Sequence, residues 1–248
     1  MNRRYRATRL VMICLLCSLL VFGVLAVGQR QPQPALLPAS QAERVAYLTF
    51  DDGPSATTEA ILDILKQYGV RATFFVTGQQ EKYLPLVGRE LAEGHHVGIH
   101  TYTHDFNEIY ASADSFFADQ NRMRRYLFVN YAYLTKDFRF PGGSSNTLVS
   151  RGILRDILEQ AEQRGLRYHD WNVDTRDAVG ARSAQLIIRN LERGLEQIGG
   201  DPAVILLHDI PTSRSVEALP QIIELLQNQG YRFDTVNNLK NPVVHRLK

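Results

Sequence analysis

The chain has 248 residues, of which 44% are hydrophobic and 22% are charged, so it is long and apolar enough for one globular domain with a hydrophobic core. Residues 1–40 carry five of the 28 basic residues and no acidic residue, which leaves 23 basic and 26 acidic residues and a net charge of −3 in the remainder. This balance, with no basic tract after residue 40, argues against a nucleic-acid-binding protein, and we expect no nucleic-acid partner.

The N-terminal residues have the pattern of a targeting segment. Four arginines within the first nine residues precede an uncharged run, Leu10–Val27, that is about as long as a bilayer-spanning helix. We expect residues 1–27 to be a signal anchor or a cleaved signal peptide, and the length of the run favours the anchor. The domain would then be extracytoplasmic, either membrane-anchored or secreted. Cys14 and Cys17 lie inside the run, so the domain has no cysteine for disulfide or thiolate chemistry.

Residues 28–42 are rich in Gln, Pro and Ala and predict a linker, followed by a single domain over residues 43–248. Short apolar runs in this domain alternate with longer amphipathic segments. The predicted strands are Val45–Phe50, Ala72–Val76, Val97–Ile99, Phe138–Phe140, Leu166–Trp171, Ala203–Leu207 and Tyr231–Phe233. The predicted helices are Thr57–Tyr68, Tyr83–Glu93, Ser112–Tyr133, Leu148–Arg164, Ser183–Ile198 and Val216–Gln229, and several of them end at a glycine.

This alternation over about 200 residues predicts a parallel α/β fold. Seven strands favour a barrel, complete or incomplete, and a doubly wound sheet is the alternative. The choice matters because α/β barrels carry their chemistry on the loops at the carboxyl ends of the strands.

Polar residues lie at or shortly after the carboxyl ends of five of the seven predicted strands. They are Asp51 and Asp52, His100 and His104, Arg139 with Pro141 and Gly143, Asp174 and Asp177, and finally His208 after Leu206. A barrel would bring all of these side chains to one opening.

The spacing of His100 and His104 is typical of metal ligands. On one helical turn, residues four apart point the same way, and two histidines with a carboxylate form a metal site with open positions. Asp52 or Asp51 would supply the carboxylate. The alternative is a solvated helix face with two histidines and no metal.

Adjacent aspartates in an extended segment point to opposite sides, so we expect a division of roles between Asp51 and Asp52. One would bind the metal and the other would act as a base, held by bidentate bonding to an arginine such as Arg139. The alternative is that Asp-Asp-Gly-Pro is only a turn and that Arg139 is a surface ion-pair residue.

Other residues could protonate the leaving group or bind the oxyanion in such a reaction. His208 has a pKa suited to protonating a leaving amine, and Asp177 or Asp174 could orient it. Gly142 and Gly143 leave the backbone open enough to direct an N–H at an oxyanion. His208 could instead be a core histidine.

Five segments in order resemble the motifs of polysaccharide deacetylases, the NodB-homology enzymes of carbohydrate esterase family four. They are "TFDDGP" (49–54), "HTYTH" (100–104), "RFPGG" (139–143), "DTRDA" (174–178) and "LLH" (206–208). The resemblance extends from about residue 43 to the C-terminus and implies a distorted (β/α) barrel of seven to eight parallel strands.

The resemblance also implies a role for each matching residue. Asp51 would be the catalytic base that activates water, Arg139 would orient it, and Asp52, His100 and His104 would bind a divalent metal, usually zinc. The Gly142 N–H would bind the oxyanion, Leu206 would line the acetyl pocket, and His208 would be the general acid, with Asp177 as its orienting partner.

Two positions depart from the family pattern. Ala178 stands where the family often has a tryptophan, and Ile99 stands where it often has a polar residue such as asparagine. Trp171, the only tryptophan, lies six residues before Asp177, so the acetyl pocket could be built differently here.

We therefore expect a metal-dependent hydrolase that removes N-acetyl groups from an extracellular polysaccharide, with peptidoglycan N-acetylglucosamine as the expected substrate. The alternatives are a chitooligosaccharide deacetylase, an O-acetyl xylan esterase, a non-haem iron oxygenase, which also uses two histidines and a carboxylate, and a glycan-binding relic without activity. We expect a monomer that meets the membrane only through its N-terminal helix.

Overall fold

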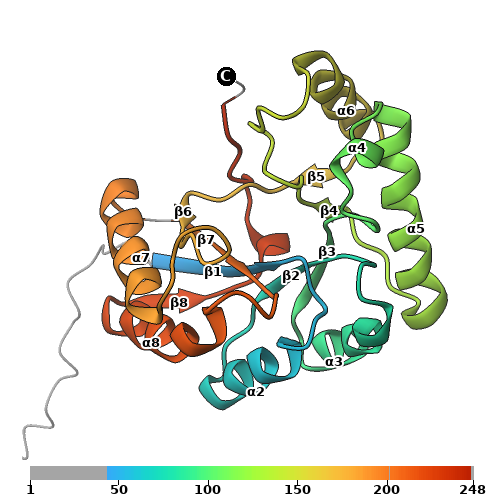
Figure 1. Ribbon diagram of the computed structural model, residues 1–248. Coiled ribbons are helices and arrows are strands. Elements are labelled where there is room, and N and C mark those ends of the chain that lie inside the picture. The colour runs from blue at the N-terminus through green and yellow to red at the C-terminus, as the bar shows by residue number, and fades with distance from the viewer. Residues whose placement is uncertain (1–43, 201, 247–248) are drawn as a thin grey trace, which may run out of the picture. The chain divides into compact units, whose positions relative to one another are not determined.

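The computed structural model describes residues 44–200 and 202–246 (Figure 1). The predicted signal segment, residues 1–27, and the predicted linker, residues 28–42, lie outside the described residues. Among the residues that are described, no helix has both the length and the hydropathy needed to cross a membrane. The described residues belong to one compact unit, Ala42–Lys248.

Eight strands pair in parallel in one sheet. They are β1 (Arg44–Asp51), β2 (Thr73–Val76), β3 (His96–Ile99), β4 (Asp137–Phe138), β5 (Arg167–Tyr168), β6 (Val173–Asp174), β7 (Ala203–His208) and β8 (Tyr231–Phe233). The hydrogen-bonded order is β5-β4-β3-β2-β1-β7-β6, and β8 pairs with the first residues of β1. Because all pairs are parallel, the strands end at the same edge of the sheet (Figure 1).

The sheet is curled into an open barrel. β5 and β6 lie at opposite ends of the strand order, yet only residues 169–172 connect them. Such a link spans at most about 17 Å, so the two edges must lie close together. No ladder joins β5 to β6 within residues 44–200 and 202–246, so the barrel stays open at this point. The prediction of a distorted parallel barrel is confirmed, and the doubly wound alternative is wrong.

The two faces of β1 explain why its sequence is apolar at almost every position. Ala46, Leu48 and Phe50 pack in the large cluster shared with the surrounding helices. Val45 and Tyr47 point the other way, into a small cluster inside the barrel. A strand covered on both faces cannot alternate apolar with polar residues, and each fully buried large side chain contributes about 2 kcal/mol of hydrophobic free energy.

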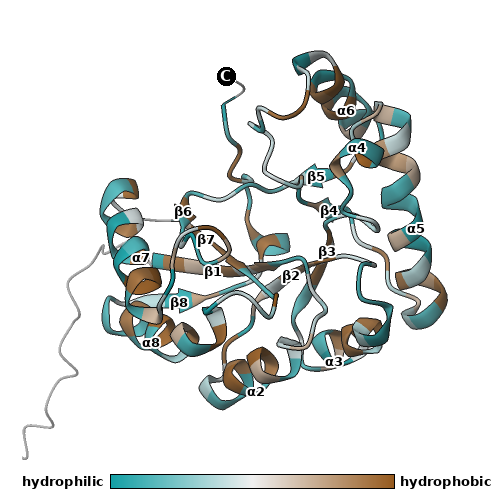
Figure 2. Cartoon of the chain, viewed as in Figure 1, coloured by the Kyte–Doolittle hydropathy of each residue, from teal (hydrophilic) through white to brown (hydrophobic). Residues whose placement is uncertain are grey.

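Helices surround the sheet and turn their apolar sides toward it (Figure 2). They are α2 (Thr58–Tyr68), α3 (Val87–Ala92), α4 (Phe106–Ile109), α5 (Ala113–Tyr131), α6 (Arg151–Gln163), α7 (Ala184–Ile198) and α8 (Ser215–Asn228), with 3₁₀ helices η1 (Glu81–Leu86) and η2 (Val236–Asn238). Serine side chains cap α5, α6 and α7 at their N-termini by accepting a backbone N–H of the first turn. Gly69 ends α2 in the left-handed conformation, as its sequence position predicts.

Two predicted elements differ from the structure. The helix predicted over Tyr83–Glu93 is divided into η1 and α3, and Pro85 lies inside η1, where it lacks a backbone N–H for a continuous α-helix. The strand predicted over Leu166–Trp171 is only the two-residue β5, because the chain then leaves this edge and crosses to β6 at the other edge. β6 and the short helix α4 were not predicted.

The two histidines of the "HTYTH" segment do not share a helical turn. Residues 100–105 form a loop between β3 and α4, and His104 has a φ of 56°. The prediction of a helical pair is therefore wrong, although the loop still brings the two imidazole rings to 5.2 Å between centroids.

Candidate active site

Asp51 ends β1 with its carboxylate buried beside the Arg139 guanidinium. The Nη1 group of Arg139 donates to Asp51 Oδ1 at 2.9 Å and to Thr49 Oγ1 at 2.7 Å. Its other N–H groups donate to the backbone carbonyls of His169 (2.8 Å) and Asp170 (3.0 Å). Arg139 thus holds Asp51 through one hydrogen bond, and the expected bidentate pair is not formed. Asp51 Oδ2 is left for another partner.

Asp52 does not continue the extended strand, so the expectation that the two side chains point to opposite sides does not apply, and the Asp52 carboxylate approaches both histidines. Its φ is 75°, and its Oδ1 lies 3.4 Å from His100 Nε2 and 3.2 Å from His104 Nε2. Asp51 Oδ2 is farther from His100 Nε2, at 3.9 Å. Asp52, His100 and His104 form the candidate metal cluster of the described residues, with one donor atom from each side chain and all donor atoms within 4.8 Å of one another.

The spacing of these donors fits a small divalent cation. Ligands about 2.0–2.1 Å from a tetrahedral zinc ion lie about 3.3 Å from one another, close to the two donor distances from Asp52. Asp52 Oδ1 is also buried without a hydrogen bond. A buried carboxylate oxygen without a donor is costly unless a cation neutralises it. The three residues therefore fit a metal.

The hydrogen bonding of His100 selects the tautomer that a metal needs. His100 Nδ1 lies 2.9 Å from the carbonyl oxygen of Arg139, which can only accept, so Nδ1 carries the proton. The lone pair of the neutral ring is then on Nε2, toward Asp52. Burial lowers the pKa of His100 and favours this neutral form.

His208 and Asp177 form a hydrogen-bonded pair beside Asp51, in which Asp177 is buried and His208 is partly exposed. His208 is the last residue of β7 and pairs in register with Asp51 of β1, and its Nδ1 lies 2.8 Å from Asp177 Oδ1. Burial disfavours the imidazolium, but the hydrogen bond and charge of Asp177 outweigh it and raise the pKa of His208 to about 9. Asp174, the alternative partner, is exposed and accepts the Arg176 N–H instead.

Gly142 lies in an exposed turn after β4. It has a φ of 76°, and its N–H donates to no acceptor within the described part of the chain. The carbonyl of the preceding Pro141 accepts the Tyr110 hydroxyl at 2.9 Å, and the Gly143 N–H donates to Phe140 O at 2.8 Å. The turn thus leaves one backbone donor free. Leu206 is buried in β7, beside Thr49 of β1.

One supporting residue, Asp209, was not found from the sequence. Asp209 is fully buried behind the "DDGPS" turn, where it accepts the hydroxyls of Ser55, Thr57 and Thr58. A Cβ on Gly53 would lie 2.3 Å from Asp209 Oδ2, which explains a glycine there. Asp209 follows His208 directly, but nothing in its spacing pointed to this role.

Known proteins resemble this chain along most of its length. The family profile for polysaccharide deacetylase matches residues 39–169. A peptidoglycan-N-acetylglucosamine deacetylase from Bacillus cereus is 34% identical over 201 residues, which cover 77% of this chain and 68% of that protein. A bifunctional xylanase/deacetylase from Pseudobutyrivibrio xylanivorans is 35% identical over 81% of this chain and 31% of that protein.

A solved structure has the same fold. The catalytic domain of a peptidoglycan N-acetylglucosamine deacetylase from Eubacterium rectale superimposes with a TM-score of 0.78 and 35% identity, over 87% of this chain and all of that one. With a profile that spans more than half of its length and relatives above 30% identity, the chain belongs to the polysaccharide deacetylase family.

Proposed function

We propose that this enzyme removes N-acetyl groups from N-acetylglucosamine residues of peptidoglycan, with a divalent cation, zinc, held by Asp52, His100 and His104. The observation that carries the proposal is the meeting of a candidate metal cluster, a buried carboxylate and a carboxylate-bound histidine at the ends of β1, β3 and β7. A cation held by these three residues would supply Lewis-acid polarisation of an amide carbonyl and would make nearby water more acidic.

The remaining steps belong to the protein's own side chains. Asp51, with Oδ1 held by Arg139, takes a proton from the attacking water through Oδ2. The free N–H of Gly142 donates to the oxyanion that develops on the carbonyl oxygen. His208, charged because of Asp177, gives its proton to the amine nitrogen as the C–N bond breaks. The products are acetate and a glucosamine residue, whose amine becomes protonated in neutral solution.

The names of the relatives support peptidoglycan as the substrate. The Bacillus cereus and Eubacterium rectale proteins are both named for it, whereas the Pseudobutyrivibrio protein combines a deacetylase with a xylanase. Chitooligosaccharides and acetylated xylan remain the alternative substrates. We propose an extracytoplasmic location, membrane-anchored or secreted, on the basis of the apolar run Leu10–Val27.

The test is acetate release by the purified chain from peptidoglycan, chitooligosaccharides and acetylated xylan, with added zinc and with a chelator. We expect zinc-dependent release that is fastest from peptidoglycan. Faster acetate release from another glycan would identify that glycan, and not peptidoglycan, as the preferred substrate. Metal binding without release from any of the three would favour a glycan-binding relic.

A second prediction concerns the alkaline limit of activity. Replacing Asp177 with Asn removes the carboxylate that raises the pKa of His208, so the acid loses its proton at lower pH. We expect the alkaline limb of kcat/KM to move to lower pH and the maximal rate to fall about 100-fold. With a cation bound, we expect this limb to lie below pH 9, because the cation would offset the charges of Asp51 and Asp52 that help to raise the pKa of His208 to about 9.

Asp174→Asn is the matched control for this pH profile. Asp174 lies three residues from Asp177 and is exposed, and its carboxylate accepts the Arg176 N–H, so its replacement should leave both limbs of the profile in place. A shift in the Asp174 variant but not in the Asp177 variant would transfer the orienting role to Asp174.

A further inference from the structure

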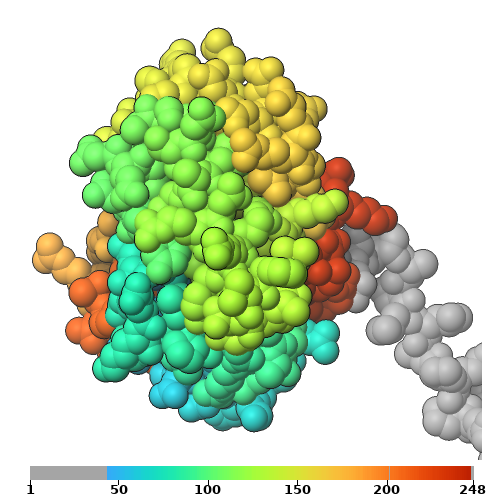
Figure 3. Space-filling view, turned by 90° about the vertical axis from the view of Figure 1, so that its right-hand side faces the viewer, coloured from blue at the N-terminus to red at the C-terminus, as the bar shows by residue number. Residues whose placement is uncertain are grey.

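The C-terminal segment, residues 241–246, lies along the link between β5 and β6, where the barrel is open. The Asp170 N–H donates to the carbonyl of Val243 at 2.8 Å, so the two stretches are joined through their backbones. Figure 3 shows the red C-terminal residues beside the gold-coloured segment that includes β5. Just before this segment, Val236 and Leu239 are buried in the small cluster inside the barrel, and Val243 packs against it.

Asp170 connects this segment to the loop that carries Gly142. Its side chain is fully buried, and it accepts the Ser144 N–H at 2.8 Å, the Ser144 hydroxyl, and the His245 N–H at 2.7 Å. Three donors on one buried carboxylate restrain all the groups that supply them. Its backbone carbonyl also accepts a hydrogen bond from Arg139, the residue that holds Asp51.

His245 adds a second connection to the same two elements. Its Nε2 donates to the Trp171 carbonyl at 2.8 Å, which leaves Nδ1 to accept the Ser145 hydroxyl at 3.2 Å. The ring also contacts the Trp171 indole edge-on, with centroids 4.8 Å apart. A Cβ on Gly143 would lie 3.0 Å from Trp171 and 3.2 Å from His245 Nδ1, so the loop is closely packed against both rings.

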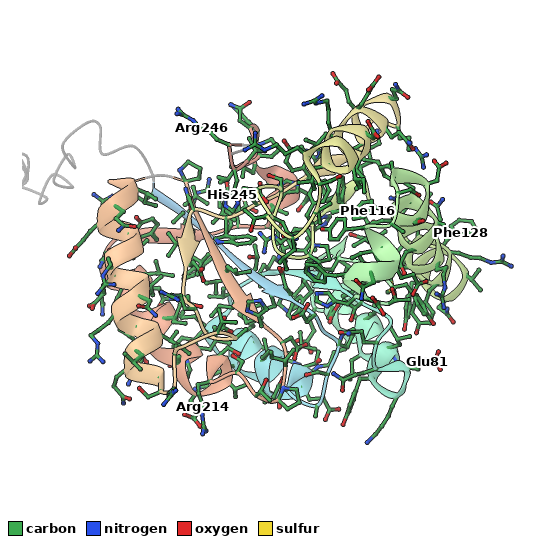
Figure 4. All side chains as sticks on the ribbon, turned by 45° about the horizontal axis from the view of Figure 1, so that its top comes forward. Glu81, Phe116, Phe128, Arg214, His245 and Arg246 are labelled. Atoms are coloured by element: carbon green, nitrogen blue, oxygen red, sulfur yellow. The ribbon has the colours of Figure 1, made fainter. Side chains whose placement is uncertain are left out.

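Trp171 in turn touches the arginine of the active site. Its ring centroid lies 5.5 Å from the Arg139 guanidinium carbon, and the guanidinium also stacks on Phe75 at 4.3 Å. The residues on either side of His245 lie, in contrast, on the surface. Val244 and Arg246 are exposed, and Figure 4 shows Arg246 extending away from the body of the molecule.

We propose that His245 and Asp170 are positioning residues for catalysis, through which the C-terminal segment fixes the Gly142–Ser145 loop and the Arg139 side chain. The proposal rests on the proposed function, because it assigns the loop to the oxyanion and Arg139 to the catalytic base. Neither residue touches the reacting atoms. Their effect is on the placement of the Gly142 N–H and the Asp51 carboxylate, where a displacement of about 1 Å can lower the rate by up to about 100-fold.

The experiment compares His245→Ala, His245→Gln and Val244→Ala in the full chain. We expect His245→Ala to lower kcat about 10-fold and to leave KM and zinc affinity unchanged. His245→Gln keeps an N–H for the Trp171 carbonyl and should recover part of kcat. Val244→Ala changes an exposed neighbour and should match the unmodified enzyme. Hydrogen exchange of the Gly143 and Ser144 amides should be faster in His245→Ala than in either of the other two variants.

Each possible result either supports or contradicts the positioning role of His245. An unchanged kcat in His245→Ala, or a loss of zinc affinity as large as the loss of kcat, would overturn the positioning role. If His245→Ala does not fold, His245→Gln is the variant that tests the proposal. An unaltered kcat together with unaltered hydrogen exchange of the Gly143 and Ser144 amides in His245→Gln would contradict the proposal. If the unmodified enzyme releases no acetate, the proposed function fails separately, and unchanged amide exchange in the loop would then overturn the connection itself.

Discussion

Asp51→Asn should abolish most turnover while the protein keeps its divalent cation. Asp51 Oδ1 is held by Arg139, so Oδ2 is the oxygen available to accept a proton from water. An amide of nearly the same shape can still accept the Arg139 hydrogen bond, but it cannot act as a base. We expect kcat to fall by about 10³-fold or more, within the range for general-base catalysis. The measurements are acetate release and zinc content after dialysis against a zinc buffer.

The cation measurement separates two roles for Asp51. Asp52 Oδ1 is closer than Asp51 Oδ2 to His100 Nε2, so zinc binding should survive the loss of the Asp51 charge. Asp52→Asn is the matched comparison, because this variant should lose both zinc binding and activity. Zinc loss with residual activity in the Asp51 variant would exchange the roles of the two aspartates.

His104→Ala should weaken zinc binding by more than about 100-fold, because it removes one of three donors. Loss of a residue that only supports a ligand already costs 10–100-fold in affinity, so loss of a ligand should cost more. His104 lies in a loop, and its side chain is about one quarter exposed. The fold should therefore tolerate alanine, and near-native circular dichroism with low zinc affinity is the expected result.

His96→Ala is the control for this variant. His96 begins β3, the strand that leads to His100, but its Nε2 lies 2.9 Å from Asp137, away from the metal cluster. We expect it to reduce stability and to leave zinc affinity unchanged. If zinc affinity is unchanged in His104→Ala as well, His104 is not a ligand.

The pattern of the sequence was sufficient to place most strands and the residues that follow them. Apolar runs such as Val45–Phe50 became buried strands, because parallel strands inside a barrel are covered on both faces. Since all strands of such a sheet end at one edge, the sequence predicted that Asp51, His100 and His208 lie close together.

Local spacing was a poorer guide to backbone conformation. The four-residue separation of His100 and His104 suggested a helix, yet these residues lie in a loop, and His104 has a positive φ. The separation brought the rings together because the loop folds back, which periodicity cannot reveal. The apolar run Leu166–Trp171 was likewise divided by the chain crossing from one edge of the barrel to the other.

The sequence by itself determined the fold class, the order of the motifs and the chemical groups at the strand ends, because these depend on periodicity and residue type along short stretches. Only the tertiary structure decided that His208 pairs with Asp177 and not with Asp174, that Asp209 braces the "DDGPS" turn, and that His245 reaches the Gly142 loop. These contacts join residues 31, 151 and 100 positions apart. They depend on how the barrel closes, and no local pattern in the chain encodes them.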